Sequence, residues 1–333
     1  MSEKRGHIAA IVALRGLAAV LIMFFHYILK TINFIHDERV IYYVSFFDLA
    51  VPIFFVISGI VIPFSLIKSK YKLSQFGTFM LKRCARIEPP YLVTIVLALC
   101  YVYMREMIPG TVPSDYRPGL WDIVMHLGYL VPFIEGARWL SEVFWTLAIE
   151  FQYYLVMALC MPLLLHSKAI WRWTFFILFC AASYLPFGDR QVLFWSPIFL
   201  CGIVYALKHL NTISLREYLL IGTLSLLFVW YKMGFENFCA VLFTLSVIWL
   251  RPNFQTRISD FFGNISYSLY LLHMITGGAI VNILSHYATA PWQKFAVVMI
   301  GFSFATGCAY IFYRLIELPS MRWSQRLRYK DRN

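Results

Sequence analysis

Long apolar runs, separated by short polar breaks, follow one another along almost the whole chain. Each run is bounded by charged residues, Pro or Gly, and most approach the roughly 20 apolar residues that a helix needs to cross a membrane. We therefore predict an all-α polytopic membrane protein with about ten transmembrane helices, and an even number of helices places both termini on one side. The predicted spans are residues 8–29, 42–67, 89–106, 143–166, 170–187, 192–208, 217–233, 236–250, 263–285 and 294–316.

The interval 107–142 interrupts this pattern because it is the least apolar part of the chain. It carries several residues that end regular structure and mark loops, namely Pro109, Gly110, Pro113, Pro118 and Gly119. Residues 121–133 form a short stretch of mixed polarity. We predict an extracytoplasmic loop over 107–142 that contains a short interfacial or re-entrant segment.

Composition agrees with a membrane protein. The 333 residues are 60% hydrophobic, 18% aromatic and 14% charged, whereas a soluble globular protein is about a quarter charged. A soluble fold of this length could not bury so much apolar surface. The formal net charge of +12 would suggest nucleic acid as a partner of a soluble protein, but in a membrane protein it first concerns topology. We therefore expect membrane lipid as a partner and no nucleic acid.

The distribution of Lys and Arg predicts the orientation in the membrane. If the N-terminus is inside, the inside segments carry 20 of these residues and the outside segments carry 8. Basic residues beside spans are retained in the cytoplasm, so we place both termini there. Residues 1–333 then form a single membrane domain, and residues 317–333 form a short basic cytoplasmic tail. No small-residue cleavage site follows the first apolar run, so we expect a permanent span of a multi-pass cell-membrane protein, in the inner membrane if the protein is bacterial.

The cysteines give no indication of a metal site. There are seven of them, none forms a Cys-x-x-Cys pair, and most lie in apolar runs. Their odd number argues against a disulfide framework and against zinc. The glycine patterns of dinucleotide-binding and phosphate-binding loops are absent from the sequence as well. We expect no metal cofactor.

Five ionisable residues lie well inside the predicted spans, where a charge costs several kcal/mol unless it faces a cavity or a partner. They are Arg15, His26, Asp48, Glu150 and His273. Arg15 and His26 are eleven residues apart in one span, which amounts to three turns plus about 20°, so they share one helix face at levels about 16.5 Å apart. The alternative is that Arg15 reaches to the inner headgroups and His26 is an ordinary interfacial histidine.

Several short motifs surround these residues in a fixed order. The segment from Arg15 to His26 has the spacing Arg-x10-His, and Phe-Phe-Val-Ile-Ser-Gly follows at 54–59. Arg83-x-x-Arg86 precedes Ile-Glu-Pro-Pro-Tyr at 87–91. Three further segments are Trp-Thr-Leu-Ala-Ile-Glu-Phe-Gln-Tyr-Tyr-Leu at 145–155, Gly-Asn-Ile-Ser-Tyr-Ser-Leu-Tyr-Leu-Leu-His at 263–273, and Glu-Leu-Pro at 317–319. Together this series resembles acyltransferase family 3, whose membrane proteins move acyl groups, usually acetyl, from coenzyme A onto sugars of cell-surface glycans.

One position departs from the family pattern. Many members have an aspartate two residues before the Phe-Phe pair of the second-helix motif, where this chain has Pro52. Asp48 lies four residues earlier, one helical turn away on nearly the same face. We expect Asp48 to serve in place of the usual carboxylate, with a less certain role than that of His26.

The resemblance implies that acetyl-coenzyme A is the acyl donor and that Arg83 and Arg86 bind its phosphates. Two arginines three residues apart share one face if their segment is helical, and guanidinium groups suit bidentate phosphate contacts. The retention of basic residues in the cytoplasm is an alternative explanation for the same pair. Arg15, deeper in the bilayer, would contact the donor along its arm.

Acetyl transfer to a hydroxyl group needs a base, and neutral histidine suits this role near pH 7. We assign His26 as the general base, with an acyl-carrying nucleophile as the alternative. A second group, commonly a carboxylate, should fix its tautomer. Counting the helical rise from the outer ends, His26, Asp48 and Glu150 lie about 5, 9 and 10 Å deep. We rank Glu150 before Asp48 as the partner, the alternative for either being a structural hydrogen bond to Tyr or Trp.

Two other polar groups are interpreted differently. His273 shares one helix side with Tyr267 and Tyr270 at spacings of three, and a packing cluster explains this at least as well as catalysis. Ser58 and Gly59 favour close helix packing, and no base lies at the level of Ser58 to make it a nucleophile.

The sequence therefore predicts a membrane O-acyltransferase that transfers an acetyl group from cytoplasmic acetyl-coenzyme A to a hydroxyl of a cell-surface carbohydrate or glycolipid. The alternative is a transporter of an acyl donor or glycolipid without transferase chemistry, because intramembrane charges also mark substrate paths. Inverted repeats and paired broken helices would favour transport, and neither is apparent in the sequence.

Overall fold

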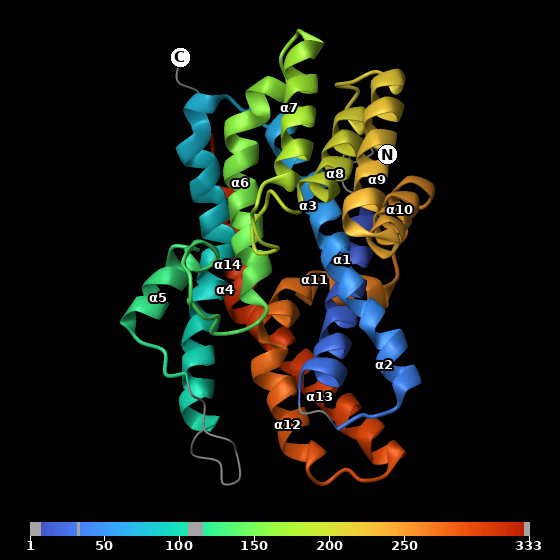
Figure 1. The fold of residues 1–333 in the computed structure, drawn as a ribbon. Coiled ribbons are helices and arrows are strands. Elements are labelled where there is room, and N and C mark those ends of the chain that lie inside the picture. The colour runs from blue at the N-terminus through green and yellow to red at the C-terminus, as the bar shows by residue number, and fades with distance from the viewer. Residues whose placement is uncertain (1–7, 32–33, 106–115, 330–333) are drawn as a thin grey trace.

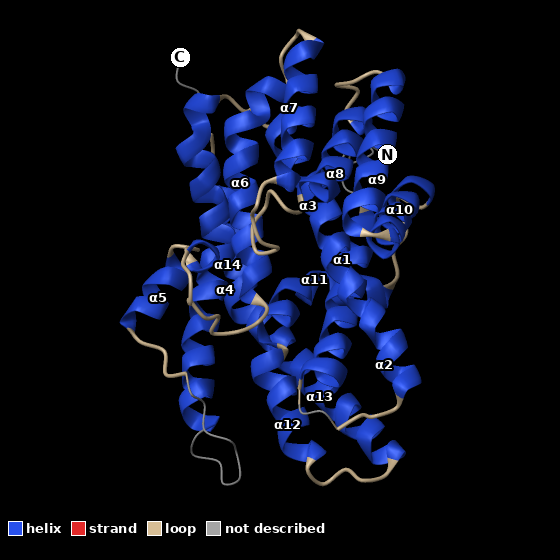
Figure 2. Ribbon diagram, in the orientation of Figure 1, coloured by secondary structure: helices blue, strands red, loops and turns tan. Residues whose placement is uncertain are grey.

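The fold was obtained as a computed structural model, and it describes residues 8–31, 34–105 and 116–329. This described part of the chain is helical throughout and contains no β-strand (Figure 2). The helices are α1 (Ala9–Phe25), α2 (Glu38–Ser45), α3 (Ala50–Lys68), α4 (Phe76–Arg105), α5 (Leu120–Leu127), α6 (Phe144–Leu164), α7 (Ala169–Ala181), α8 (Ser196–His209), α9 (Leu215–Met233), α10 (Phe235–Leu250), α11 (Arg257–Leu272), α12 (Ala279–Ser285), α13 (Pro291–Phe312) and α14 (Leu318–Arg326).

The helices confirm an all-α membrane protein. Each of the ten apolar runs in the sequence contains a helix, and five helical segments are long and apolar enough to cross a membrane. They are Ala9–Lys30, Glu38–Lys68, Leu73–Met104, Phe144–Leu164 and Pro291–Arg326. A sixth is formed if α11 and the segment Met274–Ser285, which meet at an angle of 54°, are counted as one span. The number of ten spans and the cytoplasmic position of the termini stay predictions.

The helices gather around a central group. α1 packs closely against α11, and α3 packs against α8. Figure 1 shows α4, α6 and α14 on one side of the molecule and α8, α9 and α10 on the other, with α1 and α3 between them.

Helix α4 differs from the sequence-based expectation because it begins at Phe76 and not near residue 89. Charged residues and the Pro89-Pro90 pair predicted a boundary there, since proline disfavours helix in the residue before it. The helix instead continues through both prolines, because the polar segment before them packs against α14. Arg83 and Arg86 therefore lie on one helix, as their spacing requires.

The segment expected as a basic tail is a packed helix over much of its length. α14 follows α13 through a π-helical turn, Tyr313–Glu317. Ser324 Oγ donates to the carbonyl of Lys82, 2.7 Å away, and Lys82 Nζ donates to the carbonyl of Leu327. These bonds hold the C-terminal helix against α4. Residues 330–333 lie outside the described residues.

The predicted loop is only partly described. Residues 107–115 lie outside the described residues. The remaining part forms the short helix α5 and a 3-10 turn, Val131–Phe133. Helix α5 turns Met125 and His126 inward and leaves Trp121 63% exposed. The interfacial or re-entrant position of the 121–133 segment stays a prediction.

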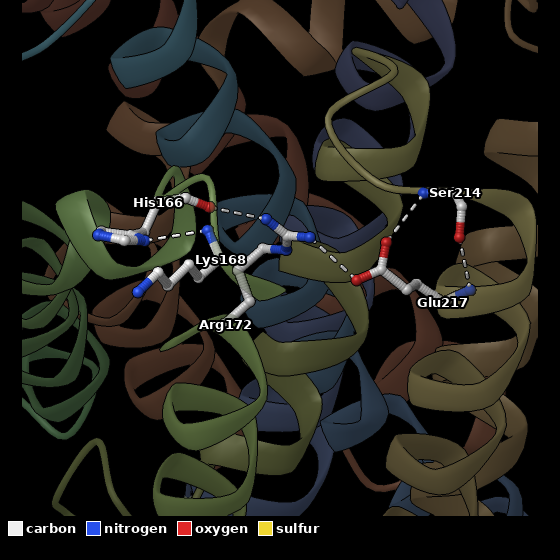
Figure 3. A network of polar contacts seen from close by, with 5 residues as sticks. All are labelled: His166, Lys168, Arg172, Ser214 and Glu217. Atoms are coloured by element: carbon white, nitrogen blue, oxygen red, sulfur yellow. Dashed lines mark hydrogen bonds and ion pairs between the residues drawn. The ribbon is translucent and has the colours of Figure 1, made fainter. Parts of the chain in front are cut away.

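A polar network joins the first turn of α7 to the first turn of α9 (Figure 3). Ser214 caps α9 through reciprocal bonds with Glu217, and Glu217 forms an ion pair of 3.0 Å with Arg172 of α7. Arg172 also donates to the carbonyl of His166. The network joins the start of α7 to the start of α9.

Helices α3 and α8 approach so closely that their backbones touch. A Cβ atom built on Gly202 would lie 2.3 Å from the carbonyl oxygen of Val56, and one built on Gly59 would lie 2.5 Å from the carbonyl oxygen of Phe199. Small residues at a crossing allow this approach, which gives dispersion contact between helices that lipid cannot replace. The crossing positions α3, which carries one wall of the site described below.

We expect Gly202→Ala to destabilise the protein by about 1–3 kcal/mol, the usual effect of adding volume to a tightly packed contact. The measurement is thermal unfolding of the protein purified in detergent. Gly222→Ala in α9 is the matched control, because a Cβ there meets no atom within 4 Å. Equal melting temperatures for the two variants would contradict the close crossing.

Candidate active site

A cavity opens between the central helices and holds about 990 Å³ of empty space, its open mouth included. Four of the six residues singled out in the sequence line it: Arg15, Arg83, Arg86 and Glu150. Its other described lining residues are Val51, Phe54, Phe55, Ile57, Ser58, Val61, Ile62, Ile87, Thr146, Leu147, Tyr154, Ser266, Tyr267, Tyr270 and Glu317. The wall is therefore built by α1, α3, α4, α6, α11 and the turn before α14.

The charges of the cavity are three guanidinium groups and two carboxylates. Arg15 comes from α1, Arg83 and Arg86 come from α4, and the carboxylates are Glu150 and Glu317. Arg15 interacts electrostatically with Arg86 and with both carboxylates. Because charge in an apolar interior is costly unless compensated, the carboxylates stabilise the arginines. The one excess positive charge favours an anionic ligand.

Arg83 is the most enclosed of the three arginines, with 9% of its surface exposed. Its Nη2 donates to Ser65 Oγ at 2.8 Å, and its guanidinium lies over the rings of Phe79 and Tyr154 at 5.3 and 5.8 Å. Its Nε is buried without a hydrogen-bond partner. A buried donor of this kind is costly unless a ligand accepts from it.

Glu150 makes its hydrogen bonds inside the cavity. Its Oε1 accepts from Tyr154 OH at 2.5 Å and from Ser58 Oγ at 3.3 Å. The tyrosine bond matches the alternative considered for this carboxylate in the sequence. The serine bond corrects the expectation that no base lies at the level of Ser58, because the Glu150 carboxylate accepts from its hydroxyl.

His26 is paired with another histidine. Its Nδ1 lies 2.8 Å from the carbonyl oxygen of Ile22 and 3.1 Å from Nε2 of His273. Nδ1 of His273 lies 2.9 Å from the carbonyl oxygen of Tyr270 and 3.1 Å from that of Leu269. Both rings are buried, at 7% and 0% exposure.

These contacts fix the hydrogen positions of both rings when they are neutral. A carbonyl oxygen only accepts, so Nδ1 of His273 carries a hydrogen and its Nε2 is an acceptor. Nδ1 of His26 faces two acceptors and must therefore carry a hydrogen as well. The lone pair of His26 consequently lies on Nε2, the nitrogen from which a proton can be accepted.

The partner of His26 is thus different from the expected one. We predicted that Glu150, or else Asp48, would hold its ring, but in the described part of the chain this position is taken by the Ile22 carbonyl and by His273. Asp48 is exposed in the 3-10 turn Phe46–Leu49 that joins α2 to α3. The interruption of the helix moves its side chain away from the face that ideal helical geometry predicted.

Tyr270 connects the cavity to the histidine pair. Its ring packs against Phe54 with centroids 5.7 Å apart, and it lies 6.0 Å from the His273 ring. Its hydroxyl forms a hydrogen bond of 2.6 Å with Thr146 Oγ1. Phe54, Thr146 and Tyr270 all line the cavity, so the histidines lie one layer of side chains beyond it.

Two residues of the site were not assigned to it from the sequence. His273 had the signal of its spacing with Tyr267 and Tyr270, which fitted packing equally well. Glu317 belonged to the Glu-Leu-Pro motif but was counted with the tail, because apolar length placed the end of the last span at residue 316. The described residues contain no group of three or more His, Cys, Asp or Glu side chains that could hold a metal ion.

A comparison with protein families shows the family to which the chain belongs. A family model described as an acyltransferase domain, that of acyltransferase family 3, matches residues 8–314. The chain is therefore a membrane acyltransferase. It belongs to acyltransferase family 3, and the match spans nearly all of its length. Neither a curated protein nor a solved structure matches the chain significantly.

Glu317 is central to the stability of the cavity. It is 4% exposed, and its Oε2 accepts from the backbone N–H of Ser268 at 3.1 Å and from Ser268 Oγ at 2.5 Å. It also interacts electrostatically with Arg15 and Arg86. The carboxylate thus joins the C-terminal helix to α11 and to the charged cavity.

We expect Glu317→Ala to lower the free energy of unfolding by about 3 kcal/mol, because it removes the acceptor of two hydrogen bonds from Ser268 and one of the two carboxylates that compensate the arginines. Glu317→Gln keeps an oxygen acceptor and should cost less. Denaturation in detergent is the measurement, with exposed Glu142→Ala as the control. The assignment fails if Glu317→Ala is as stable as the control.

Proposed function

We propose that the protein is an O-acyltransferase that moves an acetyl group from acetyl-coenzyme A to a hydroxyl of a cell-surface carbohydrate or glycolipid, in the cell membrane. The observation that carries the proposal is the pairing of an arginine-lined cavity with a neutral histidine whose basic nitrogen is defined. The cavity suits an anionic donor, and the histidine suits proton removal. Neither feature alone would distinguish an acyltransferase from a binding protein.

The donor occupies the cavity in this proposal. Arg83 and Arg86 contact its phosphates, and the unpartnered Nε of Arg83 provides one donor for them. Arg15 lines the same cavity and contacts the arm of the donor. Glu150 balances these positive charges and does not orient the base. In this proposal Tyr270 and Phe54 turn aside when the thioester reaches His26, because their rings lie between the cavity and the histidine pair.

The acetyl group is then transferred in one displacement. Nε2 of His26 accepts the proton of the acceptor hydroxyl while its oxygen attacks the thioester carbonyl carbon. The new carbon–oxygen bond forms, the carbon–sulfur bond breaks, and the proton on Nε2 passes to the departing thiolate. The products are the O-acetyl ester and coenzyme A, and the histidine returns to its starting state. His273 acts as a positioning residue, because its Nε2 accepts the Nδ1 hydrogen of His26 throughout.

We expect His26→Ala to lower acetyl transfer by about 10²- to 10⁴-fold, the contribution typical of a positioned base. The measurement is release of free coenzyme A from acetyl-coenzyme A by membranes supplied with surface glycan or glycolipid. His286→Ala, at an exposed histidine after α12, should be unaffected and serves as the control. Undiminished turnover by a folded His26→Ala protein would remove His26 from the mechanism.

The histidine pair gives a separate expectation. His273→Ala should reduce kcat about tenfold or more with little change in the KM for the donor, because the His26 ring loses the acceptor that orients it. His273→Gln offers an amide oxygen as acceptor and should restore part of kcat. A role limited to folding would show no such recovery, and a rise in KM alone would contradict positioning of the base.

A further inference from the structure

A second hollow lies beside the cavity and is strongly basic. Five cationic side chains line it, and none of its described lining residues is acidic. The lining consists of Ser65, Lys68, Ser69, Lys70, Lys72, Gln75, Lys82, Gln325, Leu327, Arg328 and Tyr329. We call this hollow the basic cleft. The retention of positive charge on the cytoplasmic side explains basic residues near a span end, but it does not require them to surround one hollow.

The basic cleft contains a lysine in a backbone conformation that residues other than glycine seldom adopt. Lys70 has a φ angle of 49°, in the left-handed region where glycine is strongly favoured after a helix. The backbone N–H groups of Lys70 and Tyr71 donate to the carbonyls of Ile67 and Leu66, which closes the end of α3. The turn that ends α3 thus carries Lys70, one of the cations that line the cleft.

Lys82 is the partly buried cation of the cleft, and uncharged groups contact its ammonium group. Lys82 Nζ donates to the carbonyl of Leu327 and lies 5.4 Å from the centre of the Tyr329 ring. A carbonyl and a ring face orient an ammonium group without removing its charge. The cleft therefore presents a concentrated positive potential to an anion.

The basic cleft and the cavity are separate hollows that the same elements line. α3, α4 and the C-terminal segment line both. One face of α3 lines both hollows. Its residues Val51, Phe54, Ser58 and Val61 line the cavity, and Ser65 and Lys68 line the cleft. By helical rise this face extends about 26 Å.

A single hydrogen bond stands at the boundary between the two hollows. Arg83 lines the cavity and Ser65 lines the cleft, and Arg83 Nη2 donates to Ser65 Oγ at 2.8 Å. An elongated ligand with a polyanionic end and an uncharged arm fits this arrangement. Its anionic end lies among the lysines, and its arm passes Arg83 into the cavity.

We propose that the basic cleft binds the phosphorylated nucleotide end of the acyl donor, and in particular the 3′-phosphate of coenzyme A, while Arg83 and Arg86 contact the diphosphate. This inference rests on the proposed function. The ligand chemistry, a phosphate group on an organic carrier, is shared with anionic lipid headgroups. The nucleotide is favoured because the cleft adjoins the cavity at the Arg83–Ser65 hydrogen bond, and in the proposed function that cavity holds the reacting end of the donor.

The test compares coenzyme A with 3′-dephospho-coenzyme A. Titration calorimetry is done on the full-length protein in nanodiscs of phosphatidylcholine, which has no net charge. Wild-type protein should bind coenzyme A about tenfold more tightly than 3′-dephospho-coenzyme A, the effect expected of hydrogen bonds to a charged phosphate. The double variant Lys72→Gln/Arg328→Gln should bind both compounds with the weaker affinity. Both side chains are exposed, so the fold should be preserved.

Arg216→Gln is the matched control, because Arg216 is an exposed cation on α9 and does not line either hollow. It should keep the tenfold preference. In acetyl transfer, the double variant should raise the KM for acetyl-coenzyme A by a similar factor and leave kcat at saturating donor unchanged. A raised KM with an unchanged kcat distinguishes a donor-binding role from a catalytic one.

Three results would overturn the proposal. The first is equal binding of the two compounds by wild-type protein, and the second is an unchanged preference in the double variant. The third is a loss of bound phosphatidylglycerol from the double variant, measured by native mass spectrometry, with coenzyme A binding intact, which would assign the cleft to a lipid headgroup. Normal acetyl transfer with any of these results leaves the proposed function standing, whereas absence of all coenzyme A binding and transfer contradicts both.

Discussion

The structure depends on the compensation of charge inside an apolar helix bundle. Arg15, Arg83 and Arg86 are positive groups in an interior that lipid surrounds, and they are tolerated because Glu150 and Glu317 lie on the same cavity. The compensation is incomplete by one charge, so the interior is stable without a ligand and still attractive to an anion. Because the five residues come from α1, α4, α6 and the turn before α14, this balance also determines which helices must be neighbours.

Much of the fold could be predicted from the sequence because apolar length is a strong signal in a membrane protein. The ten apolar runs correspond to helices, and the motif series led to the family that the chain belongs to. The predicted start of α4 was wrong, because packing against α14 outweighs the tendency of proline to end a helix at the residue before it. Helix boundaries that tertiary contacts decide are not encoded in the segment itself.

The candidate site was predictable to the extent that a helix face determines it. Arg83 and Arg86 lie on the cavity as their spacing suggested, and so do Arg15 and Glu150. The partner of His26 was not predictable, because depth along a helix gives the level of a side chain but not the direction it takes across the bundle. His273 reaches His26 from α11, 247 positions away in the sequence.

The attachment of α14 to α4 has a consequence for how the protein is made. Lys82 and Leu327, and Lys82 and Ser324, are joined by hydrogen bonds across most of the chain length, and Glu317 completes the cavity. During synthesis, α3 and α4 leave the ribosome long before the helix that closes both hollows. A nascent chain therefore holds its buried arginines without one of their two carboxylates until Glu317 and α14 arrive, and the cavity is completed only at that point.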